Sequence, residues 1–265
     1  MKHFFSFLAA AAALVSCSQN KQVLVVYYSQ TGITKTVAEE FQRQLGADIE
    51  CIEVEDAYDG NYTETIDRCQ REMAEGKLPV VKPLSSDLSK YDMIFVGYPI
   101  WFGTCALPML SWLESVDLAG KTIVPFCTFG SGGLNTSTAD IRKAEPEATV
   151  FDGYGVRAAR IAAAPKEITR FLVENGYRKG KVVTYEDYSA QREVTTEDVR
   201  IFNDACSDYQ FPLGVPVSVG LRKTSDGIDY KFTAISKGMD GNESEVTIFV
   251  TAPNEGKAEF TQVVR

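Results

Sequence analysis

Short apolar runs alternate with amphipathic segments between residues 21 and 180. Runs rich in β-branched and aromatic residues predict buried strands at 23–28, 48–54, 91–97, 122–128 and 149–152. An apolar residue at every fourth position predicts a helix over 33–45, and further helices are predicted at 62–74, 108–113, 138–144 and 165–174. This alternation predicts a doubly wound α/β fold, a parallel sheet with helices on both faces. Ligands bind such sheets at the carboxyl ends of the strands, where the strand order reverses.

The pattern changes after residue 180. Residues 195–198 form a capping pattern, and the helix predicted after them carries Val199, Phe202 and Cys206 on one side. Alternating apolar residues then predict four strands, at 215–221, 228–232, 246–250 and around residue 260. The sequence therefore predicts a small α+β domain at 195–265, a helix followed by an antiparallel four-stranded meander. The polar residues 181–194 are the predicted linker from the first domain at 21–180.

The amino terminus is predicted to be a signal peptide, residues 1–16. Its apolar run, residues 4–15, is too short to span a bilayer. Residues 14–17, Leu-Val-Ser-Cys, resemble the lipobox of bacterial lipoproteins, in which the cysteine is acylated. The resemblance implies lipidation at Cys17, an anchor and tether at 17–20, and a protein anchored by lipid to a bacterial membrane in the cell envelope, periplasmic or on the surface. The alternative is an ordinary secretory signal with an incidental cysteine.

Composition excludes several functions. Lys and Arg number 27 and Asp and Glu 36, a net charge of −9, so the chain offers no general positive field to a nucleic acid. The single histidine, His3, lies in the predicted signal peptide, which excludes a Ser-His-Asp or Cys-His hydrolytic site and the usual histidine-containing zinc site; no metal is expected. The cysteines after Cys17 show no CxxC spacing and are predicted to be buried free thiols, with one disulfide left open: Cys51, Cys69, Cys105, Cys127 and Cys206.

The loop at 29–34 follows the first strand and begins a helix. Short hydroxylated residues, a glycine and a helix amino terminus together favour an anion, because backbone N–H groups and the helix dipole face it. The loop lacks the GxxxxGK[ST] form of a Walker nucleotide site, so a phosphomonoester suits it better. The alternative is a simple helix cap.

Two further loops follow the third and fourth strands. Residues 97–104 carry Trp101 and Phe102, which can stack on a flat ring or cover the core or a partner domain. Residues 128–133 are rich in glycine, so their N–H groups can approach the polar edge of a heteroaromatic ring. The alternative for the latter is a flexible turn.

These segments resemble the flavodoxin-like FMN-binding proteins over residues 21–178. Residues 27–41 (YYSQTGITKTVAEEF) resemble their phosphate loop and first helix. Residues 97–114 (GYPIWFGTCALPMLSWLE) and 126–143 (FCTFGSGGLNTSTADIRK) resemble the segments on the two sides of the isoalloxazine ring. The resemblance implies a parallel sheet of order 2-1-3-4-5, non-covalently bound FMN, and one- or two-electron flavin chemistry.

The resemblance also assigns residues of this chain to FMN. The phosphate would be held by Ser29, Gln30, Thr31, Gly32, Ile33 and Thr34. One side of the ring would be lined by Pro99, Ile100, Trp101, Phe102, Gly103 and Thr104. The other side would be lined by Thr128, Phe129, Gly130, Ser131, Gly132 and Gly133. Phe129 stands where many short-chain flavodoxins have tyrosine, which leaves the stacking partner open.

The second domain is similar to cystatin-like modules. The similarity lies in residues 208–213 (DYQFPL), 217–232 (VSVGLRKTSDGIDYKF) and 245–250 (EVTIFV). The glycine-bearing central turn of that family is altered here at 220–227, so inhibitor activity does not carry over.

Three functions follow from these observations. The first is an FMN flavoprotein at the outer face of a bacterial membrane, either an electron carrier or an NAD(P)H/quinone-type oxidoreductase, in which the flavin itself reacts. Its partners would be a redox partner protein or a small-molecule electron donor or acceptor. The second is a non-redox binding lipoprotein built on a flavodoxin fold. The third is a cystatin-like inhibitor or adhesion module carried on an inert α/β domain.

Overall fold

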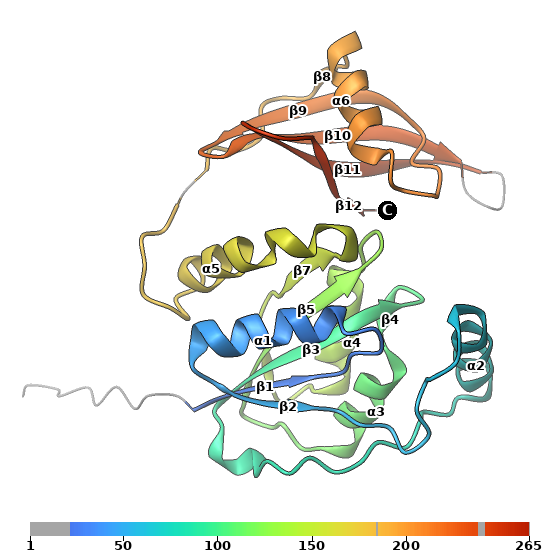
Figure 1. Cartoon of the computed structure of the whole chain (residues 1–265), viewed down its shortest axis with the longest axis vertical. Coiled ribbons are helices and arrows are strands. Elements are labelled where there is room, and N and C mark those ends of the chain that lie inside the picture. Colours follow the sequence, from blue (N-terminus) through green and yellow to red (C-terminus); the bar gives the residue numbers. More distant parts are fainter. Residues whose placement is uncertain (1–21, 184, 238–241, 265) are drawn as a thin grey trace, which may run out of the picture.

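The computed structural model describes residues 22–183, 185–237 and 242–264 (Figure 1). The predicted signal peptide, Cys17 and the tether at 17–20 lie outside the described residues. The chain forms an α/β domain followed by a smaller domain built on an antiparallel sheet.

A parallel sheet forms the centre of the first domain. Its strands lie in the order β2 (Asp48–Cys51), β1 (Val23–Tyr27), β3 (Met93–Trp101), β5 (Thr122–Phe129) and β6 (Thr149–Val150). All four pairings along this order are parallel. The predicted doubly wound α/β fold is confirmed, and the order is the predicted 2-1-3-4-5 once the short hairpin strand β4 (Thr104–Cys105) is left out of the count.

The predicted fifth strand, 149–152, is divided in the structure. Both β6 and β7 (Tyr154–Arg157) pair with β5, and residues 151–153 between them are not in a strand. The carbonyl of Ile123 accepts the N–H of Phe151 at 3.0 Å. Backbone groups two residues apart in a strand face the same neighbouring strand, so the backbone nitrogen of Pro125 also faces the segment that follows β6. Proline has no N–H to donate, which explains why the pairing is interrupted there.

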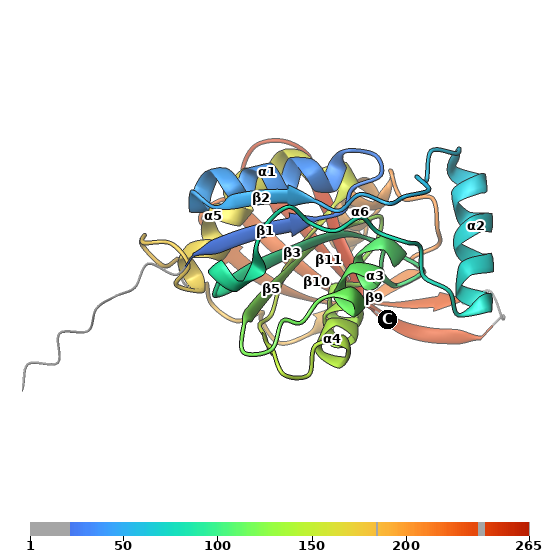
Figure 2. The ribbon, with the colours of Figure 1, turned by 90° about the horizontal axis from the view of Figure 1, so that it is seen from below.

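Helices cover both faces of the sheet (Figure 2). The helices of this domain are α1 (Ile33–Leu45), α2 (Tyr62–Glu75), α3 (Leu107–Ser115), α4 (Leu134–Ala144) and α5 (Ala164–Glu174), with the short 3-10 helices η1 (Leu88–Lys90) and η2 (Ala158–Ala163). Helices α1 and α5 lie on one face and α3 and α4 on the other, whereas α2 stands beyond the carboxyl ends of the strands (Figures 1 and 2). On the face of α1 and α5, Phe41 and Phe95 belong to one buried cluster. On the face of α3 and α4, Trp112 and Ile94 belong to another. The sheet is thus buried on both faces, as its continuous apolar strands predict.

The C-terminal domain is an antiparallel sheet with one helix on it. The strands β8 (Arg192–Glu193), β9 (Val215–Thr224), β10 (Gly227–Lys237), β11 (Glu243–Pro253) and β12 (Glu259–Val264) lie in the order 12-11-10-9-8. The helix α6 (Thr196–Cys206) starts with a capping box between Thr195 and Asp198, and Phe202 packs on Phe232 with ring centres 5.2 Å apart. The predicted helix and meander are confirmed. The structure adds β8, which lies in the predicted linker and is too short to show an alternating pattern.

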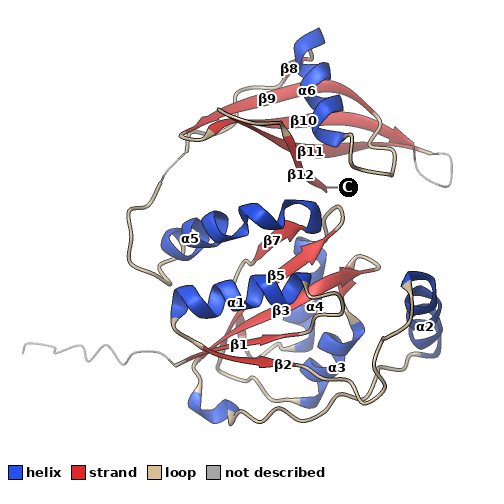
Figure 3. Cartoon of the chain, in the orientation of Figure 1, coloured by secondary structure: helices blue, strands red, loops and turns tan. Residues whose placement is uncertain are grey.

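The two domains contact each other at one end of the C-terminal sheet (Figure 3). Strand β12 lies beside β7 and the 128–133 loop, and the N–H of Val263 donates to the carbonyl of Ser131 at 2.9 Å. The face of the sheet opposite α6 faces α5. The C-terminal domain therefore lies against one of the three loops that the sequence predicts to be functional.

Candidate functional site

The first loop joins β1 to the amino terminus of α1. Gly32, the N-cap residue, has a φ of 89° and provides no side-chain cap. The hydroxyl oxygen of Ser29 accepts the N–H groups of Gly32 and Lys35, both at 3.2 Å. The N–H groups of Ile33 and Thr34 form no hydrogen bond with any described residue. Unpaired N–H groups at the positive end of a helix dipole favour an anion, and anion binding at this loop stays a prediction.

Two side chains predicted to face the phosphate hold the loop instead. The amide nitrogen of Gln30 donates to the carbonyl of Tyr58 at 3.1 Å and to the hydroxyl of Thr65 at 2.9 Å. The hydroxyl of Thr34 is buried and lies 2.8 Å from that of Thr128. Gln30 and Thr34 can therefore bind an anion only through their backbone N–H groups, because their side chains are bonded within the protein.

The second loop is a tight hairpin between β3 and β4. Strand β3 continues four residues beyond its predicted end, to Trp101, which pairs with Thr104. Phe102 and Gly103 between them have φ values of 50° and 85°, as in a type I′ turn. Among the described residues, Phe102 is the only non-glycine with positive φ, and its side chain is 49% exposed. A strained, exposed aromatic of this kind is typical of a functional site.

Trp101 is fixed by two tyrosines. Its ring is half-buried and meets Tyr28 and Tyr58 edge-on, with ring centres 5.7 Å and 5.2 Å apart. Neither tyrosine is among the predicted site residues. The one sequence signal that could have identified them is their position: Tyr28 directly follows β1, and Tyr58 lies in the segment after β2. Burial raises the pKa of both phenols above their ordinary value, most strongly by desolvation, so both stay neutral.

The third loop lies between β5 and α4. Phe129 is 5% exposed, and a Cβ added at Gly155 would lie 2.7 Å from its ring, so this ring packs in the core. The N–H groups of Ser131 and Gly132 have no hydrogen-bond partner in the described part of the chain. The third loop can therefore contact a ligand through these two N–H groups, whereas the Phe129 ring is buried in the core.

The three loops lie together at the carboxyl edge of the sheet. The Thr34–Thr128 hydrogen bond joins the first loop to the third. A Cβ added at Gly133 would lie 2.8 Å from Ile100, so the third loop also touches the second. The edge-on contact of Tyr28 with Trp101 links the end of β1 to the second loop. The chain thus brings a helix amino terminus with unpaired N–H groups, a half-buried indole and the free N–H groups of the third loop to one place.

The sequence model of one family, described as flavodoxin, matches residues 22–172. The chain belongs to the flavodoxin family. No curated protein matches the chain. Among solved structures, the flavodoxin domain is similar to a protein from Bacteroides uniformis ATCC 8492 described as a flavoprotein, with 25% identity, 56% of this chain and 98% of that chain covered, and a TM-score of 0.51.

Two further solved structures are similar to the flavodoxin domain. One, from Bacteroides eggerthii DSM 20697 and also described as a flavoprotein, has 28% identity, covers 57% of this chain and 99% of its own, and has a TM-score of 0.48. A flavoprotein in complex with FMN from Lactobacillus acidophilus NCFM has 22% identity, covers 55% of this chain and 99% of its own, and has a TM-score of 0.45. Each of these three matches covers a little more than half of this chain and almost all of the other chain.

The thiols of the flavodoxin domain are poor nucleophiles. Burial raises the pKa of the Cys105 thiol to about 12 and that of Cys127 well above its ordinary value. The prediction that all five thiols are buried is wrong for Cys51, which is exposed because it ends the edge strand β2, and for Cys206, which is only partly buried. All five are free. The described residues contain no group of three or more His, Cys, Asp or Glu arranged to hold a metal ion.

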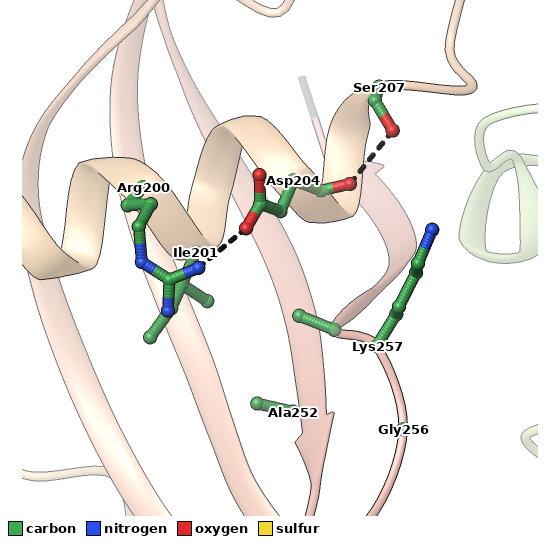
Figure 4. A pocket seen from close by; sticks show the side chains of 8 residues that line it. Arg200, Ile201, Asp204, Ser207, Ala252, Gly256 and Lys257 are labelled. Atoms are coloured by element: carbon green, nitrogen blue, oxygen red, sulfur yellow. Dashed lines mark hydrogen bonds and ion pairs between the residues drawn. The ribbon is translucent and has the colours of Figure 1, made fainter.

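Two hollows on the surface are not lined by the first or the second loop. One, of about 450 Å³, lies between α6 and the turn from β11 to β12; Figure 4 shows Arg200 and Asp204 of α6 joined by a 2.8 Å hydrogen bond at its wall. The other, of about 1050 Å³, lies between α5 and the C-terminal sheet, and Phe129 is the only residue of the three loops that lines it. The candidate site therefore rests on the convergence of the loops and not on these hollows.

Proposed function

We propose that this flavodoxin-family protein binds FMN non-covalently where the three loops meet. The observation that carries the proposal is the convergence at one sheet edge of the amino terminus of α1, the Trp101–Phe102 hairpin and the free N–H groups of the third loop. Each of these elements suits a different part of one ligand that has a phosphate at one end and a flat ring at the other.

The residues present fit such a ligand. The N–H groups of Ile33 and Thr34, with the hydroxyls of Ser29 and Thr31, would hold the phosphate. The hairpin would cover one face of the ring, and the N–H groups of Ser131 and Gly132 would donate to its polar edge. Bound FMN would supply the one- or two-electron chemistry, while the protein positions it and limits its access to water.

We further propose that the protein works in electron transfer or in NAD(P)H/quinone-type oxidoreduction at the outer face of a bacterial membrane. Its anchor would be lipid on Cys17, supported by the lipobox-like residues 14–17. In the described part of the chain, none of the helices has the length and apolar character needed to cross a membrane. The partner would be a redox protein or a small-molecule electron donor or acceptor.

The C-terminal domain we interpret as cystatin-like. Its one helix, lying across an antiparallel sheet of consecutive strands, supports this interpretation. The segment predicted as an altered turn, 220–227, belongs mostly to β9 and leaves only residues 225 and 226 as the turn to β10, so it gives no support to an inhibitor activity.

Native purification followed by an absorbance spectrum tests the proposed function. We expect a yellow protein, and an apoprotein that recovers one FMN per chain on titration. A folded, colourless protein that does not take up FMN would favour a non-redox binding role. Steady-state NAD(P)H oxidation with a quinone would identify an enzyme, whereas flavin reduction only by a partner protein would identify a carrier.

A further inference from the structure

Strand β12 of the C-terminal domain approaches the third loop very closely. The N–H of Val263 donates to the carbonyl of Ser131 at 2.9 Å. A Cβ added at Gly132 would lie 2.6 Å from the carbonyl oxygen of Val263. A side chain at position 132 would collide with β12, so glycine at this position permits the close approach of the strand.

Arg157 ties the same loop to the C-terminal domain a second time. It ends β7 beside the end of β5, and its side chain is 5% exposed. Its Nε donates to the carbonyl of Gly130 at 2.9 Å, Nη1 to the carbonyl of Phe260 at 3.0 Å, and Nη2 to the carboxylate of Asp208 at 3.3 Å. The guanidinium also lies over the Phe260 ring, 4.3 Å from its centre. One buried cation thus joins the loop, β12 and the segment after α6.

These contacts fix the direction of the peptide groups in the loop. The carbonyl of Gly130 and the N–H of Ser131 belong to one trans peptide, and so do the carbonyl of Ser131 and the N–H of Gly132. In a trans peptide the carbonyl and the N–H point in opposite directions. Because the carbonyl of Gly130 points to Arg157 and that of Ser131 points to β12, the N–H of Ser131 points away from the Arg157 side chain and the N–H of Gly132 points away from β12. On either side of them, Thr128 and Gly133 contact the first and second loops.

We propose that Arg157 and β12 are positioning elements of the flavin site: they hold the carbonyls of Gly130 and Ser131 so that the N–H groups of Ser131 and Gly132 face the polar edge of the ring. The C-terminal domain is then part of the flavin site. This inference rests on the proposed binding of FMN.

A pair of arginine variants in the full-length chain provides the test. Arg157→Gln removes the cation that touches the loop. Arg160→Gln is the matched control, because Arg160 also joins the domains, through Glu259 at 2.9 Å, and contacts no residue of the loop. Both variants remove one positive charge from the same interface. The affinity for FMN and for riboflavin, and the potential of the flavin at saturation, are measured for each.

We expect Arg157→Gln to weaken the binding of FMN and riboflavin by the same factor, about tenfold, the effect of one lost hydrogen bond to the ring. The potential of its bound flavin should fall, because the donors that stabilise negative charge on the reduced ring are no longer aligned. Arg160→Gln should change neither. A change in folding alone would not alter the potential of flavin that is already bound.

The inference is overturned if Arg157→Gln binds flavin with wild-type affinity and potential, or if Arg160→Gln loses as much. Wild-type protein that binds no FMN would instead refute the proposed function. If Arg157→Gln does not fold, Val263→Pro decides: it removes the N–H that faces Ser131 from the outer edge of β12, where proline is tolerated. Its FMN affinity should also fall, and an unchanged affinity would overturn the inference.

Discussion

Replacing Trp101 by alanine should weaken FMN binding without unfolding the protein. The indole is half-buried and makes T-shaped contacts with the rings of Tyr28 and Tyr58, so part of its surface is already covered before a ligand binds. Burying a large aromatic contributes about 1.5–3 kcal/mol, and an aromatic pair adds about 0.5–1.5 kcal/mol. Allowing for the part already covered, we expect a loss of about 1–3 kcal/mol, or about 5-fold to 150-fold in Kd.

The same substitution lowers stability, and the two effects must be separated. Losing both edge-on contacts should reduce the free energy of unfolding by about 1–3 kcal/mol. Urea unfolding identifies conditions in which the variant is fully folded, and fluorescence titration with FMN and with riboflavin is then done there. Because the indole acts on the ring, both ligands should lose the same factor.

Phe151→Ala provides the control for this experiment. Phe151 is 47% exposed in the same domain but follows β6, whose pairing with β5 lies at the start of that strand and away from the loops. Its replacement should leave both affinities unchanged. A folded Trp101→Ala variant with wild-type affinity would refute the reasoning and would assign the indole to covering the core.

The remaining predictions concern the cofactor, its potential, the C-terminal domain and the membrane. Mass analysis of released flavin should find FMN, one per chain, because the short first loop has no second dinucleotide fingerprint; native FAD would contradict this. Redox titration should place the potential of bound FMN below that of free FMN and rising with salt, because a net charge of −9 disfavours added negative charge; a value above free FMN would reject it. Hydrogen bonds from Arg192 and Thr195 lower the pKa of Asp198 to about 2, so its contribution to stability is complete above its unfolded pKa and is lost as the pH falls from about 4 to 2. Asp198→Asn should therefore destabilise the protein by about 1–2 kcal/mol at pH 7 and by much less near pH 2, as thermal unfolding can show. With Cys17 lipidated, residues 18–20 give a tether of about 10 Å, and flavin at the opposite edge from the start of β1 should be quenched more by a water-soluble quencher than by one in the lipid of liposomes; the reverse order would contradict this orientation.

Local patterns in the sequence predict the fold and the place of the site. The continuous apolar strands are visible because a sheet covered on both faces needs them, and parallel strands bring their carboxyl ends to one edge. The first loop is recognisable because a glycine and hydroxylated residues precede a helix with its apolar positions four apart. These features depend on neighbouring residues, so a single sequence contains them.

The use of particular side chains depends on partners far away in the chain and cannot be read locally. Gln30 and Thr34 look like phosphate ligands, yet their side chains bond to residues 28 to 94 positions away. Phe129 occupies a glycine-rich loop in the sequence, but Gly155 leaves room for its ring in the core. In each case the sequence predicts a contact with the cofactor, and the structure shows the side chain directed into the protein instead.

The third loop shows why that direction matters for function. Its glycines predict that N–H groups can approach a ring, but every peptide has two polar ends, and only the contacts of the carbonyl decide where the N–H points. Here the carbonyls are held by Arg157 and by Val263, from β7 and from the last strand of the C-terminal domain. These contacts fix the direction of the two peptide groups of the loop. In this proposal the second domain contributes to flavin binding without binding a ligand of its own. It fixes N–H donors of the third loop before the flavin arrives, so that the flavin does not have to order them when it binds.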